Sequence, residues 1–340
     1  MTKDERLRCA VVGCGLIGKR RAEQAVAHGG TQLIAVADTS EDAAVSVAER
    51  YCVARFADWQ AIVGDADVDA VVVATPNAFL RDVAVAALNA GKHVLVEKPM
   101  GRNLGEAREM AEAAAASGRV LKIGFNHRYH PAIRRAHDLV AGGAIGVPIS
   151  ARARYGHGGR PGYEREWRGD ARLAGGGELT DQGVHVADLL HWFLGLPEEG
   201  FAYLQTAVWP IAPLEDGAFG LFRFPGGCVA GIHTSWTQWK NLFSFEVIGT
   251  TGSVAVEGLG GSYGVEHLIE TRRRMEGGAP EYTQTRYEEA DRSWELEWED
   301  FVRAVRSGAP YDGTPADGLA AMRMLDALYA SAREDRPVKI

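Results

Sequence analysis

The fold is decided by residues 8–18, RCAVVGCGLIG, where an apolar run leads directly into three closely spaced glycines. The run Arg8–Val12 is typical of a buried strand, and the residues after it open a helix. Gly13 permits a tight turn, Gly15 lets the backbone approach a diphosphate, and Gly18 allows close packing of the helix. The pattern predicts a strand, a turn and a helix whose N-terminus faces phosphate groups.

An acidic residue, Asp38, lies at the position where a dinucleotide-binding strand carries a carboxylate. Asp38 closes a second apolar run, Gln32–Ala37, about 20 residues after Gly18, which is the spacing at which a carboxylate binds ribose hydroxyls. The glycines and Asp38 together predict a dinucleotide-binding domain of the Rossmann type.

The residues after Asp38 bear on the choice of dinucleotide. They are Thr39, Ser40, Glu41 and Asp42, so no cation follows that could neutralise a 2′-phosphate. A carboxylate would also repel that phosphate, and the sequence therefore favours NAD. NADP remains possible if Asp38 rotates away and Ser40 accepts the phosphate.

Apolar runs alternate with helical patterns through residues 1–125, which predicts βαβ units and a parallel, doubly wound sheet. One helix carries capping residues at both ends, Asn103 with Glu106 at its start and Gly118 after its end. The expected strands are Arg8–Val12, Gln32–Ala37, Ala70–Ala74, His93–Val96 and Val120–Gly124.

Residues 126–340 form a second, α+β domain in this interpretation. Helices are expected over 131–141, 181–194, 294–306 and 315–333, the last of them a candidate to pack back on the first domain. A strand at 148–155 precedes a Gly/Arg-rich loop at 156–177. Short apolar segments at 202–209, 218–224, 228–236, 243–248 and 253–256 follow with tight turns between them, which predicts a mainly antiparallel sheet.

Composition excludes several classes of protein. The 340 residues are 46% hydrophobic and 24% charged with a net charge of −8, so binding to nucleic acid or to an anionic membrane surface has no electrostatic basis. No apolar run approaches the roughly 20 residues that span a bilayer. Four cysteines without a CxxC pair and a polar start at Met1–Arg8 favour a cytoplasmic protein with reduced thiols and no zinc site.

Two further segments carry groups suited to catalysis. Glu97-Lys98-Pro99 ends an apolar strand, and ligands bind at the carboxyl ends of strands in this architecture. Residues 175–185, GGGELTDQGVH, lead into a helix on which Asp181 and His185 share one face because they are four residues apart.

The order and spacing of these motifs resemble the Gfo/Idh/MocA oxidoreductase family, named for glucose-fructose oxidoreductase and inositol dehydrogenase. The resemblance covers nearly the whole chain and rests on the glycine motif, Ala74–Asn77, Gly91–Pro99, Asn126–Tyr129 and the Asp181–His185 helix. It implies a Rossmann domain followed by a domain built on a large, open-faced antiparallel sheet. It also implies NAD(P)-dependent oxidation of a secondary alcohol on a cyclic sugar or polyol, or the reverse reduction.

The resemblance assigns residues as well. Lys98, Asp181 and His185 match the family's catalytic positions. The cofactor site it implies comprises Gly13, Gly15, Leu16, Ile17, Gly18, Asp38, Thr75, Pro76, Asn77, Glu97 and Lys98. One departure concerns Leu80, where many relatives carry a histidine, so a relative's substrate preference does not transfer directly.

The chemistry needs these residue types in its own right. Hydride leaves a carbinol carbon only as the hydroxyl proton is taken up, and an imidazole with an ordinary pKa of about 6.5 suits that task. His185 is therefore the expected general base. Asp181 would orient it or bind the adjacent hydroxyl, and the Lys98 ammonium would stabilise the developing alkoxide.

Each of these residues also has a structural interpretation. Lys98 could be a surface lysine beside a strand end, Asp181 a helix N-cap, and His185 a buried histidine bonded to Asp181 or Asp188. A metal site formed by Asp181, His185 and Asp188 lacks further ligands, and no metal is expected.

Four more residues are candidates for the substrate site. Arg128 and Tyr129 follow the first domain, and Trp167 and Arg168 lie in the loop before the catalytic helix. The arginines of that loop suit a carboxylate or phosphate on a sugar. Alternatively, they pair with Glu164, Glu166 and Asp170 in a solvated loop.

A free-sugar or inositol dehydrogenase is the leading functional hypothesis. The alternatives are a nucleotide-sugar 3-dehydrogenase or ketoreductase, an NAD-dependent glycosidase, and a non-catalytic NAD-binding regulator. A homodimer or homotetramer is also expected, because the second sheet holds Phe219, Leu221, Phe222, Trp236, Phe243 and Phe245 but has too little helix to cover both faces.

Overall fold

The structure is a computed structural model that describes residues 6–340; residues 1–5, which begin the polar N-terminal segment, lie outside the described residues. The chain forms two compact units. The first unit takes the chain up to Phe125 together with Trp294–Leu319. The second unit takes Asn126–Ser293 together with Ala320–Ile340. A segment late in the sequence therefore belongs with the N-terminal part.

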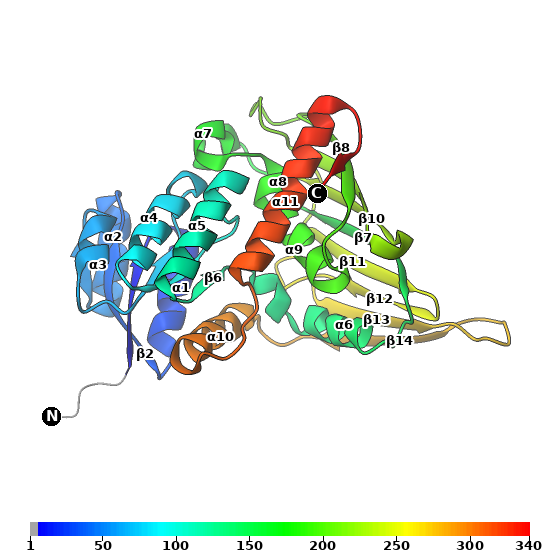
Figure 1. The fold of residues 1–340 in the computed structure, drawn as a ribbon, viewed down its shortest axis with the longest axis horizontal. Coiled ribbons are helices and arrows are strands. Elements are labelled where there is room, and N and C mark those ends of the chain that lie inside the picture. Colours follow the sequence, from blue (N-terminus) through cyan, green and yellow to red (C-terminus); the bar gives the residue numbers. More distant parts are fainter. Residues whose placement is uncertain (1–5) are drawn as a thin grey trace. The chain divides into compact units, whose positions relative to one another are not determined.

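Six parallel strands build the sheet of the first unit (Figure 1). The strand order reverses next to β1, and ligands of such sheets bind at the carboxyl ends of the strands at this point. The predicted Rossmann sheet is confirmed, with one short additional strand. In spatial order the strands are β3 (Ala54–Phe56), β2 (Thr31–Ala37), β1 (Leu7–Val12), β4 (Ala70–Val73), β5 (His93–Val96) and β6 (Leu121–Ile123).

Helices alternate with these strands. The expected caps of α5 are present: Asn103 Oδ1 accepts a hydrogen bond from the Glu106 amide at 3.0 Å, and Gly118 ends the helix with a φ of 63°. The helices are α1 (Leu16–Ala27), α2 (Glu41–Tyr51), α3 (Trp59–Gly64), α4 (Asn77–Asn89) and α5 (Leu104–Ser117).

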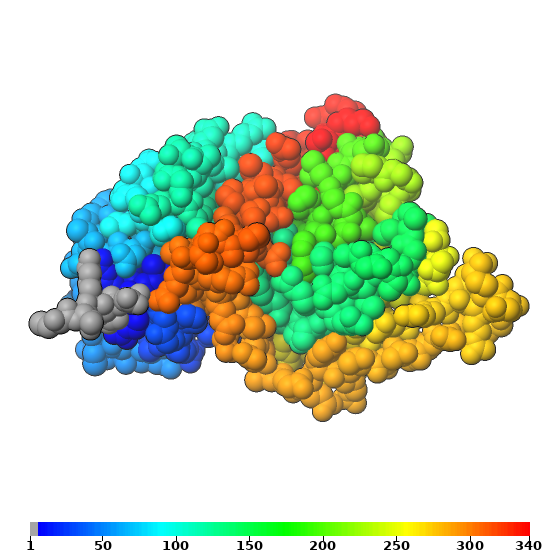
Figure 2. All heavy atoms as spheres, turned by 60° about the horizontal axis from the view of Figure 1, so that its bottom comes forward, coloured from blue at the N-terminus to red at the C-terminus, as the bar shows by residue number. Residues whose placement is uncertain are grey.

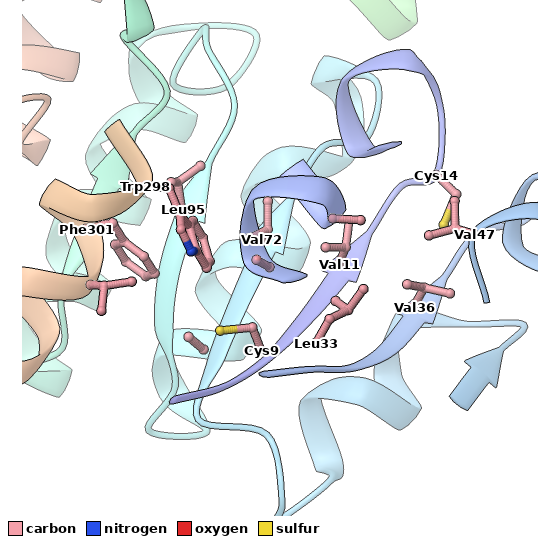
Figure 3. Close-up of a cluster of buried hydrophobic side chains, with 14 of the residues drawn as sticks. Cys9, Val11, Cys14, Leu33, Val36, Val47, Val72, Leu95, Trp298 and Phe301 are labelled. Atoms are coloured by element: carbon pink, nitrogen blue, oxygen red, sulfur yellow. The ribbon is translucent and has the colours of Figure 1, made fainter. Parts of the chain in front are cut away.

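The core of the first unit includes a helix from the far end of the chain. Trp298 and Phe301 of α10 (Ser293–Ser307) are 1% and 0% exposed and pack with strand residues such as Cys9 and Leu95 (Figure 3). Figure 2 shows α10 in orange against the blue atoms of the N-terminal strands and helices. Burial of these large aromatic rings holds α10 in the Rossmann unit.

Nine strands form the sheet of the second unit. β10 pairs with β7 in parallel, and the other neighbouring strands pair antiparallel, which confirms the mainly antiparallel sheet. In spatial order they are β14 (Glu281–Tyr287), β13 (Glu266–Arg272), β12 (Gly252–Glu257), β11 (Leu242–Gly249), β7 (Pro148–Gly156), β10 (Val229–Ser235), β9 (Gly217–Arg223), β8 (Glu199–Gln205) and β15 (Val338–Lys339).

The hairpin of β13 and β14 was not predicted from the sequence. β14 reads EYTQTRY and is exposed along nearly its whole length, so it lacks the apolar alternation that marks a half-buried strand. In Figures 1 and 2 the hairpin extends at the edge of this unit.

Helices cover one face of the second sheet. On β7, Ala153 and Tyr155 are buried on that face, while Arg152 and Arg154 are exposed on the other. The helical segments are η1 (Asn126–Tyr129), α6 (Pro131–Ala141), α8 (Glu178–Asp181), α9 (Gly183–Leu194) and the later part of α11 (Pro315–Glu334); η2 (Tyr163–Arg165), η3 (Trp167–Gly169) and α7 (Ala171–Ala174) lie in the preceding loop.

The opposite face of the sheet is open in the single chain. Phe219 and Leu221 lie there and are 46% and 53% exposed, next to Tyr203 and Val229. Phe222, Trp236, Phe243 and Phe245 are buried instead. Of the six large apolar residues that the sequence analysis named for this sheet, Phe219 and Leu221 therefore lie on the open face, and Phe222 points to the other face because side chains alternate along β9.

Among the described residues, no helix is both long and apolar enough to cross a membrane.

Candidate active site

The glycine turn between β1 and α1 leaves room for a phosphate group. Gly13 has a φ of 95°, and a Cβ there would collide with the Ala74 carbonyl, so only glycine fits. A Cβ at Gly15 would meet no atom within 4 Å. Gly15 is the N-cap of α1, and the first backbone N–H groups of a helix have no acceptor within the helix. This arrangement fits a dinucleotide's diphosphate.

Asp38 is held in place by two backbone amides. Its carboxylate accepts hydrogen bonds from Cys14 N at 2.6 Å and from Ser40 N at 2.8 Å. The Ser40 hydroxyl caps α2 by accepting from Ala43 N at 3.4 Å. The carboxylate therefore stays beside the glycine turn, and the Ser40 side chain already has a structural task.

The other predicted cofactor residues lie at the ends of neighbouring strands. Thr75 and Pro76 follow β4, and the buried Asn77 opens α4. Leu16 is 73% exposed at the start of α1, and Ile17 follows it. Leu80, the position that departs from the family pattern, is fully buried in the core.

Glu97 and Lys98 follow β5, and the Glu97 side chain has an interior partner. Arg21 of α1, which is fully buried, donates from Nε to Glu97 Oε1 at 2.6 Å and from Nη1 to Glu297 Oε2 at 2.5 Å. The Trp294 ring lies 4.5 Å from the Arg21 guanidinium carbon. Arg21 thus joins the helix that starts at the glycine turn, the segment that carries Lys98, and α10.

In the second unit, Asp181 and His185 lie on consecutive helical turns. Asp181 is the last residue of α8, and α9 begins at Gly183. Asp181 is not the N-cap of this helical segment, because the chain is already helical from Glu178 and Gly177 is the cap. His185 is 5% exposed.

A buried carboxylate fixes the start of this helical segment. Glu215 accepts hydrogen bonds from Leu179 N at 3.0 Å, from Gly177 N at 3.2 Å and from the Tyr329 hydroxyl at 2.7 Å. A Cβ on Gly177 would collide with the backbone of Glu215. The glycine run before Asp181 therefore serves close backbone approach.

Asp181 pairs with a loop residue named among the candidates. Arg168 Nε donates to Asp181 Oδ2 at 3.1 Å, and the Arg168 guanidinium carbon lies 4.4 Å from the centre of the Trp167 ring. Tyr163 is buried nearby, and burial, with the Asp181 charge, raises the pKa of its hydroxyl. Burial lowers the pKa of His157, although the Asp181 charge opposes that shift.

The remaining arginines of this loop pair with its own carboxylates. Arg160 donates two hydrogen bonds to Glu166 at 2.8 and 2.7 Å, and Arg172 reaches Asp170 at 2.8 Å. Arg165 lies 3.8 Å from Glu164. The solvated-loop interpretation therefore describes Arg160, Arg165 and Arg172.

His185 stacks on a second histidine. The ring of His127, from η1, lies 3.7 Å from the His185 ring between centroids, with 16° between the planes. His127 Nε2 lies 3.1 Å from the Tyr155 hydroxyl. Tyr155 is hydrogen-bonded to Tyr263, which accepts from Gln182 Nε2 at 2.7 Å.

Arg128 and Tyr129 have partners inside the second unit. Arg128 is 1% exposed and donates two hydrogen bonds to Asp188 of α9, at 2.9 and 2.5 Å. The Tyr129 ring lies 5.3 Å from the Arg134 guanidinium carbon. The Arg128–Asp188 pair therefore ties η1 to the helix that carries His185.

Sequence reasoning did not single out His127, Tyr155, Gln182 or Tyr263. The only indication for His127 in the sequence was its place inside the motif Asn126–Tyr129. Tyr263 lies 81 residues beyond its hydrogen-bond partner Gln182, and a single sequence gives no sign of that contact.

No cluster of three or more His, Cys, Asp and Glu side chains suited to a metal ion occurs within residues 6–340.

Comparisons with known proteins agree with the fold and the glycine site. The family model described as "Oxidoreductase family, NAD-binding Rossmann fold" matches residues 7–125, and the GFO/IDH/MocA C-terminal domain matches residues 133–255. The chain therefore belongs to the Gfo/Idh/MocA family of oxidoreductases. It is an enzyme whose cofactor is a nicotinamide dinucleotide of the NAD type.

Three relatives illustrate the similarity. The chain is 36% identical over 252 residues to the 1,5-anhydro-D-fructose reductase of Ensifer adhaerens, covering 73% of this chain and 74% of the relative. It is 27% identical to the scyllo-inositol 2-dehydrogenase (NAD(+)) of Bacillus subtilis, covering 99% and 97%. The structure of GenD2 from gentamicin A biosynthesis in complex with NAD superposes with a TM-score of 0.86 at 31% identity, covering 99% and 97%.

Proposed function

We propose that this enzyme is an NAD-dependent dehydrogenase of an uncharged cyclic sugar, inositol or related polyol, acting on one secondary alcohol or on the corresponding ketone. The proposal rests on two consecutive helical turns that carry Asp181 and the buried His185, because alcohol oxidation needs a positioned base. The named relatives that reduce or oxidise sugars and inositols support the same class.

The charge balance of the loop supports an uncharged substrate. Arg160, Arg165 and Arg172 pair with loop carboxylates, and Arg168 pairs with Asp181. A phosphate or carboxylate on the substrate would have to compete with these pairs for the arginines. The pairing therefore argues against a nucleotide sugar. Arg168 and Trp167 would instead offer a neutral, hydrogen-bonding wall to a sugar.

NAD rather than NADP is the proposed cofactor. The Asp38 carboxylate is held by two amides beside the glycine turn, where it suits ribose hydroxyls and repels a 2′-phosphate. Leu16, Ile17, Thr75, Pro76 and Asn77 complete the proposed cofactor site. Glu97, whose carboxylate binds Arg21, acts in this proposal by holding the segment of Lys98.

The proposed mechanism assigns one task to each catalytic residue. NAD, when bound, supplies the carbon that accepts hydride. His185 takes the hydroxyl proton of the substrate, and the Lys98 ammonium stabilises the oxygen as it gains negative charge. Asp181, fixed by Arg168, orients the imidazole or binds the neighbouring hydroxyl. Arg128 holds η1 against α9 through Asp188, and Tyr129 packs against Arg134 of α6.

A homo-oligomer is part of the proposal. Phe219 and Leu221, with Tyr203 and Val229, form an exposed apolar patch on the open sheet face, and Arg152 and Glu246 pair beside it. A second copy of this face can cover such a patch symmetrically.

A substrate panel tests the proposal. Purified enzyme with NAD or NADP is offered inositols, free aldoses, anhydrosugars and nucleotide sugars while nicotinamide absorbance is followed. Turnover of an uncharged member with NAD is expected. Three results would replace the proposal. A preference for nucleotide sugars would indicate a nucleotide-sugar dehydrogenase, and release of aglycone from glycosides without net NAD reduction would indicate a glycosidase. NAD binding without any turnover would indicate a non-catalytic regulator.

A further inference from the structure

The imidazole of His127 is the closest ring neighbour that the structure gives the proposed base. The two rings lie face to face at 3.7 Å, and each histidine is 5% exposed. They come from separate elements, η1 and α9, so the stack is a tertiary contact. The two hydrogen bonds between Arg128 and Asp188 fix η1 against α9 one residue after His127 and one turn after His185.

The neighbours of His127 place a hydrogen on its Nδ1. Asn126 Nδ2 donates to Ser293 Oγ at 3.1 Å, so the Asn126 Oδ1 faces His127 Nδ1 at 3.2 Å. Because this oxygen only accepts, Nδ1 carries a hydrogen. Nε2 lies 3.1 Å from the Tyr155 hydroxyl. Burial raises the pKa of Tyr155 well above its usual value, so this hydroxyl stays uncharged beside the stack.

We propose that His127 is a positioning residue for the reaction: it holds the His185 ring in place and stays neutral while His185 takes up the substrate proton. This inference rests on the proposed role of His185. Two imidazolium rings stacked at this distance would repel each other strongly, whereas a neutral ring presents a π face to the new cation.

The surrounding groups allow this division of charge. Tyr155 and Phe243 contact His127 from the sheet, and His130, bonded to Glu266, lies at 5.7 Å between ring centres. The further charged or titratable groups near the stack are Asp181 and Glu178 of α8, Tyr263, Arg168 and the Arg128–Asp188 pair. Arg168 pairs with Asp181 and Arg128 pairs with Asp188, so these four charges largely offset one another beside the stack.

Three variants separate this role from general packing. His127→Ala removes the stacked face, so we expect kcat to fall by about 10- to 100-fold with KM for the alcohol and Kd for NAD within about twofold. His127→Phe keeps a flat ring and should recover most of that loss. His137→Ala is the matched control, because His137 also stacks on an aromatic ring, Trp192 at 3.7 Å, and has no contact with His185 among those the structure gives. It should behave as the parent enzyme does.

Nitrogen-15 spectra of the histidine-labelled holoenzyme test the protonation states directly. His127, assigned from the His127→Phe spectrum, should remain neutral with Nδ1 protonated across the pH range in which His185 titrates. The inference is overturned if His127 becomes charged while His185 stays neutral, or if His127→Ala retains the parent kcat. In either case His185→Ala remains the separate test of the proposed function, since it alone removes the base.

Discussion

Asp38 contributes to cofactor choice through its charge and its fixed position. Asp38→Ala removes the acceptor for the ribose hydroxyls and the repulsion of a 2′-phosphate. We expect the affinity for NAD to fall by about 10- to 100-fold, which is the loss expected when hydrogen bonds to a charged group are removed. The ratio of the NAD affinity to the NADP affinity should become smaller. Calorimetric titration with both dinucleotides measures this. Asp42→Ala, an exposed carboxylate in the first turn of α2, is the control. A parent enzyme that binds NADP more tightly would contradict the assignment.

Cys14 lies inside the glycine turn but should be chemically inert. Burial, reinforced by the Asp38 charge, raises the pKa of its thiol to about 12. Because the thiolate is the nucleophile, alkylation of the native protein at pH 8 should leave Cys14 unmodified, whereas the exposed Cys52 reacts. Mass spectrometry of peptides after brief treatment with iodoacetamide distinguishes the two. Rapid labelling of Cys14 would show that the turn opens in solution.

At the residue scale, the sequence could predict roles for those side chains whose role depends on their spacing from nearby residues in the chain. Gly13, Asp38 and the Asp181–His185 pair could be proposed from the sequence because each proposed function needs a fixed offset along the chain. His127, Tyr155 and Tyr263 were not, because their contacts with one another come from three elements that only the folded sheet brings together. Arg128 was expected to face substrate, but its buried bond to Asp188 gives it a structural partner.

Among the elements, α10 depends on the buried ion pairs of Arg21. Glu297 is fully buried, and burial raises the pKa of its carboxyl even though the Arg21 charge opposes the shift. Glu297→Ala leaves the buried guanidinium with one carboxylate fewer, so the free energy of unfolding should fall by about 3–5 kcal/mol. Glu299→Ala, on the exposed side of the same helix, should change it by less than about 0.5 kcal/mol. Urea denaturation measures both, and equal effects would contradict this role.

The elements that were predicted well have clear periodicity or caps. α5 and α6 lie close to their expected ranges because capping residues mark α5 and a proline begins α6. β3 was missed because it has three residues, and β13 and β14 were missed because their side chains are largely polar. The place of α10 in the first unit was not foreseen, since Trp298 and Phe301 resemble the apolar face of any amphipathic helix.

For the whole molecule, the open sheet face predicts self-association. Leu221→Glu places a charge in the exposed apolar patch and should convert the oligomer to monomers, while turnover per chain persists if the site is complete in one chain. Light scattering at micromolar concentration gives the mass. Arg172→Glu, on an exposed loop, controls for the charge change. A monomeric parent protein would count against the proposed interface.

The central claim is that His185 accepts the substrate proton. In a folded His185→Ala protein, turnover of alcohol oxidation should fall by roughly two to four orders of magnitude, the range of general-base removal, with NAD affinity within about twofold of the parent enzyme. Lys98→Ala should also lower turnover, because the alkoxide then loses its ammonium partner. Steady-state absorbance at saturating NAD measures the rates. A His185→Ala enzyme that binds NAD and oxidises its substrate at nearly the parent rate would contradict the account.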